Sequence, residues 1–152
     1  MEAKTLQPSA KELYDADFLE WTVRNAELLR ARRFDEIDLD NIIEEIESLE
    51  RAERRRLRST GEVLLAHLLK WRFQPARRGA SWKGTIRVQR LRIGHLIEEM
   101  PSLRPTLPES VAKAYQVARA MAAAQSRLPE ETFPSTCPFR LEQILDDEFF
   151  PE

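Results

Sequence analysis

The sequence has one cysteine, two histidines and four glycines among its 152 residues, and each shortage excludes a class of structure or chemistry. With Cys137 alone, the chain can form neither an intramolecular disulfide nor a zinc site built from several thiolates. It contains no glycine-rich phosphate-binding loop and no nucleophile elbow. The nearest match to a di-iron motif is His95-Leu-Ile-Glu98, which occurs once and in reversed order. We therefore expect no metal and no cofactor.

Long hydrophobic runs are also missing. The longest covers residues 63–69, even when His67 is counted, whereas a helix that spans a bilayer needs about 20 apolar residues. The opening sequence, MEAKTLQPSAKELYDADF, lacks the apolar stretch of a secretory signal. We expect a soluble, cytoplasmic protein that does not associate with membranes.

The residues that are abundant favour helices. Alanine, leucine, arginine and glutamate dominate, 42% of residues are hydrophobic and 33% are charged, and no strand pattern or internal repeat is present. A chain of this length can bury a core as one domain. We expect residues 1–12 to form a disordered tail. Residues 13–152 are expected to form a single all-α domain, a bundle of four to five main helices with a short C-terminal helix.

Apolar residues at helical spacing predict the inward face of each helix. The first predicted helix has Asp15 as its N-cap and runs to about residue 32. The second begins at Asp38, and its inward face comprises Leu39, Ile42, Ile43, Ile46 and Leu49. The third ends at residue 74, because the residue before a proline is pushed out of the helical conformation. Its inward face comprises Leu57, Gly61, Leu64, Leu65 and Leu68.

Between the second and third helices lies the run ERAERRRLRS, which contains neither proline nor glycine. The sequence leaves open whether these two helices are continuous. A fourth helix is predicted from Ser81 to residue 100, with an inward face of Trp82, Ile86, Ile93, Ile97 and Met100. A fifth begins near Thr106 or Leu107, has Pro108 in its first turn and reaches about residue 127. Its inward face comprises Val111, Ala114, Tyr115, Ala118 and either Met121 or Ala122.

Charge is distributed in two blocks of opposite sign. Residues 34–50 contain eight acidic side chains and no basic one, and residues 63–97 contain eight basic side chains and no acidic one. The basic block also carries three large aromatic residues, Trp71, Phe73 and Trp82. The net charge of the whole chain is only −2, so any attraction to nucleic acid would have to come from this block alone.

Two interpretations of the basic block are open. In the first, the two blocks pair within the chain, each exposed pair contributing about 0–1 kcal/mol, and Arg87 and Arg90 meet acids of the second helix. In the second, the turn between the third and fourth helices binds an external anion, and Arg77 and Arg78 are the best placed for it. We favour pairing within the chain. The candidate ligand-binding residues of the second interpretation are Lys70, Arg72, Arg77, Arg78, Lys83, Arg87 and Arg90.

Several segments resemble a bacterial family known as domain of unknown function 29. They are YDADFLEWT, RRFDEIDLDNIIEEIESL, HLLKWRFQPARRGASWKGTIRVQR, LIEEMPSL and FPSTCPFRLEQILDDEFFP, and the resemblance that they carry spans about residues 13–151. The resemblance implies a small helical bacterial protein and implies no activity. Glu50 stands where such sequences often have glycine, which favours a continuous second and third helix.

Three functional hypotheses follow. We favour a non-enzymatic protein-interaction module that binds a protein partner, or a second copy of itself, through the basic turn or the acidic second helix. The alternative is a nucleic-acid or phosphate-ligand binder that uses the basic turn. A metal-dependent enzyme, centred on His67 with Glu44, Glu45 or Glu47, comes third, because the residues specify no catalytic chemistry.

Overall fold

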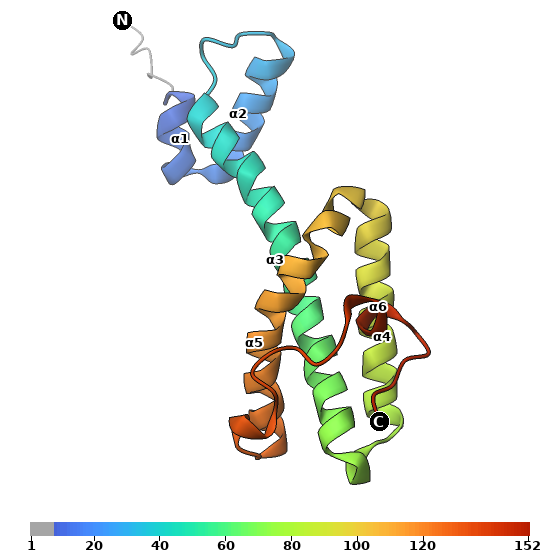
Figure 1. Cartoon of the computed structure of the whole chain (residues 1–152). Coiled ribbons are helices and arrows are strands. Elements are labelled where there is room, and N and C mark those ends of the chain that lie inside the picture. The colour runs from blue at the N-terminus through green and yellow to red at the C-terminus, as the bar shows by residue number, and fades with distance from the viewer. Residues whose placement is uncertain (1–7) are drawn as a thin grey trace, which may run out of the picture. The chain divides into compact units, whose positions relative to one another are not determined.

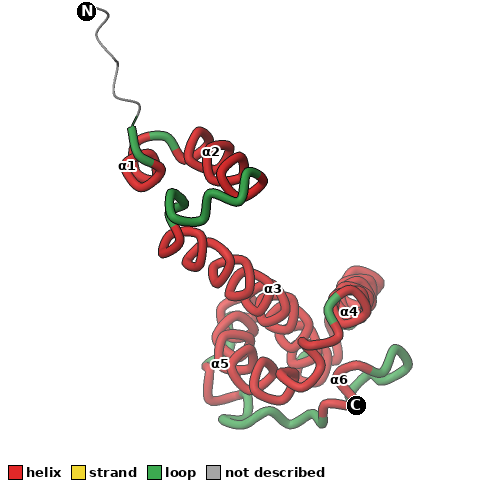
Figure 2. The backbone as a smooth tube through the Cα atoms, turned by 90° about the horizontal axis from the view of Figure 1, so that it is seen from above, coloured by secondary structure: helices red, strands yellow, loops and turns green. Residues whose placement is uncertain are grey.

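The computed structural model describes residues 8–152, and these form six α-helices, three short 3₁₀ segments and no strand (Figures 1 and 2). The predicted all-α class is confirmed. Contacts group the chain into two compact units, Met1–Arg51 and Ala52–Glu152, and a single domain over residues 13–152 stays a prediction. Most of the predicted tail lies outside the described residues, but the first helix begins at Ala10, so residues 10–12 are helical.

The first unit contains α1 (Ala10–Ala16), α2 (Phe18–Arg30) and the start of α3 (Leu39–Phe73). Ser9 and Glu12 form a capping box at the start of α1, which satisfies backbone N–H groups that have no partner within the helix. Asp17, and not the predicted Asp15, caps α2, because Asp15 already belongs to α1. The Asp17 carboxylate accepts a hydrogen bond from the backbone N–H of Glu20 at 3.0 Å.

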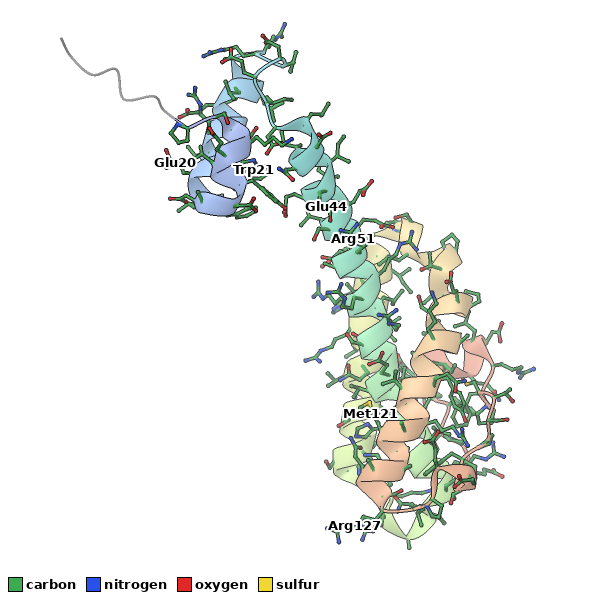
Figure 3. All side chains as sticks on the ribbon, turned by 90° about the vertical axis from the view of Figure 1, so that its left-hand side faces the viewer. Glu20, Trp21, Glu44, Arg51, Met121 and Arg127 are labelled. Atoms are coloured by element: carbon green, nitrogen blue, oxygen red, sulfur yellow. The ribbon has the colours of Figure 1, made fainter. Side chains whose placement is uncertain are left out.

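A buried carboxylate, Asp38, joins α2 to α3. Its Oδ2 accepts hydrogen bonds from the indole Nε1 of Trp21 at 3.0 Å and from the amide Nδ2 of Asn41 at 2.7 Å. Its backbone N–H donates to Oδ1 of Asn25 at 2.9 Å. Figure 3 shows Trp21 in this unit. Every buried polar group named here has a partner, which fixes the turn that precedes α3.

α3 is a single helix of 35 residues, so the second and third predicted helices are continuous. The inward face predicted for its first part is wrong: Leu39, Ile43, Ile46 and Leu49 are exposed, the last two by 61% and 69%. The helical spacing is correct, but α1 and α2 contact another face of α3. That face carries Asp38, Asn41 and Glu45, which bond within the unit.

The second unit is built from α3 after residue 51, α4 (Ala80–Glu99), α5 (Leu107–Ser126) and α6 (Leu141–Leu145). The 3₁₀ segments Pro75–Arg77, Pro101–Thr106 and Glu130–Thr132 lie between them. α4 and α5 lie beside α3 (Figure 1), and the predicted inward faces of these three helices are largely confirmed. Fully or nearly fully buried are Leu57, Leu64, Leu65, Leu68, Ile86, Ile93, Ile97, Ala114, Tyr115 and Ala118.

Small residues let α5 pack closely on α3. A Cβ atom added to Gly61 would lie 3.4 Å from the Cβ of Ala114, so the helices approach without room for a larger side chain. After α5 the chain crosses from α5 towards α4 (Figure 1). It is held on the way by Tyr115, whose hydroxyl donates to the Pro134 carbonyl at 2.5 Å, and by packing of Phe133 against Phe73.

Substitution of leucine on the two parts of α3 tests this division into buried and exposed faces. Leu68 is fully buried, so Leu68→Ala should lower the free energy of unfolding by about 2–5 kcal/mol. Leu49→Ala removes the same atoms from an exposed position and should change it by no more than about 0.5 kcal/mol. Urea denaturation measures both. Equal losses for the two variants would show that the assigned faces of α3 are wrong.

Candidate functional site

The two charge blocks belong to different units. Residues 1–51 hold fourteen acidic and seven basic side chains and carry a formal charge of −7. Residues 52–152 hold twelve acidic and seventeen basic side chains and carry +5. The acidic block of residues 34–50 lies within the first unit and the basic block of residues 63–97 within the second. Each unit therefore presents a surface of its own charge.

Several acids of the first unit have partners close in sequence. Arg33 pairs with Glu36 at 2.5 Å, and Arg51 pairs with Glu44 at 2.6 Å and with Glu47 at 3.7 Å. Figure 3 labels Glu44 and Arg51 on α3. These pairs are exposed, so each contributes about 0–1 kcal/mol and leaves the surrounding surface acidic.

Another acid of this block, Glu45, bonds to α1. The Tyr14 hydroxyl donates to its Oε1 at 2.6 Å, and this hydrogen bond to a carboxylate raises the pKa of Tyr14 to about 12. Tyr14 also packs edge-on against Trp21, with ring centres 5.0 Å apart. Glu45 thus ties α1 to α3.

In the second unit, Arg90 is the most completely engaged of the seven candidate residues. It is only 4% exposed, and its guanidinium donates to four carbonyl oxygens that follow or end α6. Nε bonds Ile144 at 2.8 Å, and Nη2 bonds Phe149 at 2.9 Å and Gln143 at 3.2 Å. Nη1 bonds Asp147 at 3.5 Å. The prediction that Arg90 meets acids of the second helix is wrong, because these carbonyl oxygens occupy its donors.

Arg78 is also held within the unit. Its Nε donates to the carbonyl of Trp71 at 2.8 Å, its Nη2 donates to the carbonyl of Pro151 at 3.4 Å, and its guanidinium lies 5.7 Å from the centre of the Trp71 ring. The prediction that nothing local satisfies Arg78 is therefore wrong. Arg77, the other arginine of this loop, is exposed, and within residues 8–152 it makes no comparable contact.

A second buried cation, Lys70, lies among α3, α4 and α5. Its Nζ donates to Gln125 Oε1 at 2.7 Å, faces His67 Nε2 at 3.4 Å and lies 5.0 Å from the centre of the Trp82 ring. His67 Nδ1 is 2.9 Å from the Val63 carbonyl, so Nδ1 donates there and Nε2 accepts. Burial lowers the pKa of Lys70. Burial first, and then the charge of Lys70, lower the pKa of His67.

The remaining candidates are exposed and differ in their surroundings. Arg72 lies 5.6 Å from the centre of the Phe73 ring, and Lys83 lies 5.6 Å from that of Phe150. Arg87 lines an open hollow of about 370 Å³ together with Lys83, Phe150 and two acids, Asp147 and Glu148. The structure thus brings Lys83, Arg87, Arg90 and Arg78 to one segment, residues 146–152, and leaves Arg72 and Arg77 apart. Whether any of them binds an external anion stays a prediction.

The partners that sequence reasoning missed are Gln125 and the 146–152 segment, whose sequence is DDEFFPE. The segment does carry a signal. It places three acids before two aromatic residues, which complements a stretch rich in arginine and tryptophan. Phe150 packs against Trp71 with ring centres 4.9 Å apart, and Phe149 packs against Phe139 at 6.1 Å.

Within residues 8–152, histidine, cysteine, aspartate and glutamate form no group of three or more that could hold a metal ion. Burial raises the pKa of the Cys137 thiol, which donates to the Phe139 carbonyl at 3.5 Å, so the thiol is not activated. In the same part of the chain, no helix is long and apolar enough to cross a membrane.

Fold and surfaces together define an all-helical protein with an acidic unit, which exposes apolar side chains, and a basic unit, whose arginines hold a segment of the chain itself. The chain belongs to the family of the domain of unknown function DUF29, whose model matches residues 13–150. This confirms the family resemblance seen in the sequence. No curated protein and no solved structure matches the chain.

The His67–Lys70 contact predicts a dependence of stability on pH. Because folding lowers the pKa of His67, the folded state binds fewer protons than the unfolded state. The stabilising contribution of neutral His67 is complete above pH 6.5, the pKa of a histidine in the unfolded chain. It is lost as the pH falls below that value. His67→Gln, which can still accept a hydrogen bond from Lys70, should weaken this dependence.

Urea denaturation between pH 5 and pH 8 measures the effect. His95→Gln, at the exposed histidine, is the matched control and should keep the wild-type profile. A His67→Gln variant that loses stability with acid as steeply as the wild type would show that this contact is not the source.

Proposed function

We propose that the chain is a non-enzymatic protein-interaction module whose first unit binds a partner protein through an apolar stripe on α3. The stripe consists of Leu39, Ile43, Ile46 and Leu49, which recur at helical spacing along one face. The observation that carries the proposal is the exposure of all four residues. A helix with this pattern normally turns its apolar face towards a partner.

The first unit is unusually rich in such residues. Of the twelve large hydrophobic side chains that are exposed in the described structure, nine lie within residues 18–49. On α2 they include Phe18, Leu19 and Val23. Single exposed apolar residues are ordinary, but this concentration in one short part of the chain favours a binding surface.

The acidic residues beside the apolar stripe indicate the charge that a partner protein carries. Asp40, Glu44, Glu47 and Glu50 lie on the same stretch of α3 and are exposed. A complementary surface has apolar side chains at its centre and lysine or arginine around them, because charge complementarity speeds association and excludes acidic competitors. An amphipathic basic helix has this chemistry.

Binding of nucleic acid or a phosphate ligand by the basic turn has less support. Lys70, Arg78 and Arg90 are occupied by partners inside the second unit. Arg72, Arg77, Lys83 and Arg87 are the exposed remainder, too few for the many phosphate contacts that give tight binding. The residues thus favour the protein-interaction function.

Charge substitution within the stripe tests the proposed function. Ile43→Asp together with Ile46→Asp places two acids at exposed positions, so the chain should stay folded and lose its partner. Val117→Asp, at an exposed position on α5, is the matched control and should keep the partner. Affinity purification from the native host, quantified by mass spectrometry, compares the three proteins. A partner set that the stripe variant retains in full would contradict the proposal.

A further inference from the structure

The second unit holds the 146–152 segment on a surface formed by Trp71, Arg78, Lys83, Arg87 and Arg90, here called the basic-aromatic surface. We propose that this surface is a peptide-binding site that recognises an acidic–aromatic segment of another protein. In the isolated chain its own 146–152 segment occupies the site. This binding site is separate from the apolar stripe of the first unit.

The contacts divide into two kinds, as peptide recognition requires. Arg90 and Arg78 donate to the carbonyl oxygens of Asp147, Phe149 and Pro151, groups that every peptide offers. Such bonds to the main chain supply affinity and select for backbone conformation, here a turn at residues 146–149 followed by irregular chain, and not for sequence.

Selectivity comes from the side chains. The Phe150 ring lies 4.9 Å from the Trp71 ring and within 5.6 Å of both the Lys83 ammonium and the Arg90 guanidinium. Cations attract the face of an aromatic ring, and buried aromatic rings are frequent anchors at interfaces. A ligand for this site therefore carries an aromatic residue at the position of Phe150.

The acids of the segment lie beside the basic side chains of the surface. Asp147 and Glu148 line the open hollow of about 370 Å³ together with Lys83 and Arg87. An acidic pair that precedes the aromatic anchor thus lies beside two exposed basic side chains. The complete recognition pattern is two acids, two aromatic residues and a proline, as in the sequence DEFFP of residues 147–151.

Residues 146–152 lie outside the regular helices, although Phe149 and Phe150 pack against the core and the segment supplies two of the four carbonyl oxygens that Arg90 contacts. Ile144, in α6, is 1% exposed and belongs to the hydrophobic core, whereas the residues after α6 form no regular helix or strand. Asp147 and Glu148 are exposed, Phe149 and Phe150 are partly buried, and Pro151 is buried. A competing peptide of the same chemistry therefore needs to displace only residues 146–152.

A fluorescent, acetylated and amidated heptapeptide of sequence DDEFFPE is the probe. In the full chain, Phe150→Ala weakens the internal occupant, so the peptide should bind this variant at least about tenfold more tightly than it binds the wild type. A peptide with both phenylalanines replaced by alanine should bind at least about tenfold more weakly than the probe. Fluorescence anisotropy measures all of these affinities.

Two further variants locate the site. Lys83→Ala with Arg87→Ala, added to Phe150→Ala, should weaken binding by about tenfold or more. Lys113→Ala in the same background is the matched control, because Lys113 is an exposed lysine that pairs with Glu109 on α5. It should leave binding unchanged. If Phe150→Ala does not fold, titration of the wild type at high peptide concentration, followed by the NMR signal of the Trp71 indole, carries the same test.

Four outcomes would overturn the proposal: no binding by a folded Phe150→Ala variant, equal binding by wild type and variant, equal binding of the alanine peptide, or equal weakening by Lys113→Ala. Analytical ultracentrifugation adds a fifth. A wild-type dimer that the peptide dissociates would mean that copies of the chain exchange the segment with each other, in place of a separate partner.

Discussion

The second unit depends on one buried cation, the guanidinium of Arg90. Taking a charge out of water is expensive unless its hydrogen-bonding groups find partners. Arg90 meets this requirement with the carbonyl oxygens of Gln143, Ile144, Asp147 and Phe149, two of which lie in α6 and two beyond it. A cation is favoured where the carbonyl groups of a helix end lack partners, so one side chain on α4 both ends α6 and places the residues that follow.

This arrangement decides what the rest of the basic block can do. Three cations, Arg90, Arg78 and Lys70, donate hydrogen bonds to carbonyl and amide oxygens within the unit. The other basic side chains of the block are the ones left to contact a ligand. The first unit shows the opposite arrangement. Its acids pair weakly with nearby arginines, while apolar side chains of α3 face solvent. Two surfaces of different chemistry, one acidic and apolar and one basic and aromatic, suit a protein that connects binding partners.

The helices and the inward faces of the second unit could be predicted because they depend on periodic spacing of apolar residues. Leu64, Leu68 and Ile86 are buried as predicted. The same spacing misled on Leu39, Ile43 and Ile46, because periodicity identifies an apolar face but not whether the chain supplies anything to cover it. The partners of Arg90 could not be predicted from the sequence, for another reason. They are backbone carbonyls, which every residue has, so no residue type marks them.

Hydrogen exchange in an Arg90→Gln variant tests the central role of this side chain most directly. Arg92→Gln is the control, at an exposed arginine on α4 outside the basic-aromatic surface. The backbone N–H groups of Ile144 and Phe149 are bonded within the part of the chain that Arg90 holds. Glutamine cannot supply the donors that reach four carbonyl oxygens. In Arg90→Gln, both amides should therefore exchange much faster, while amides of α3 near Leu65 keep their protection. Unchanged protection at Ile144 and Phe149, or the same loss in Arg92→Gln, would contradict the account.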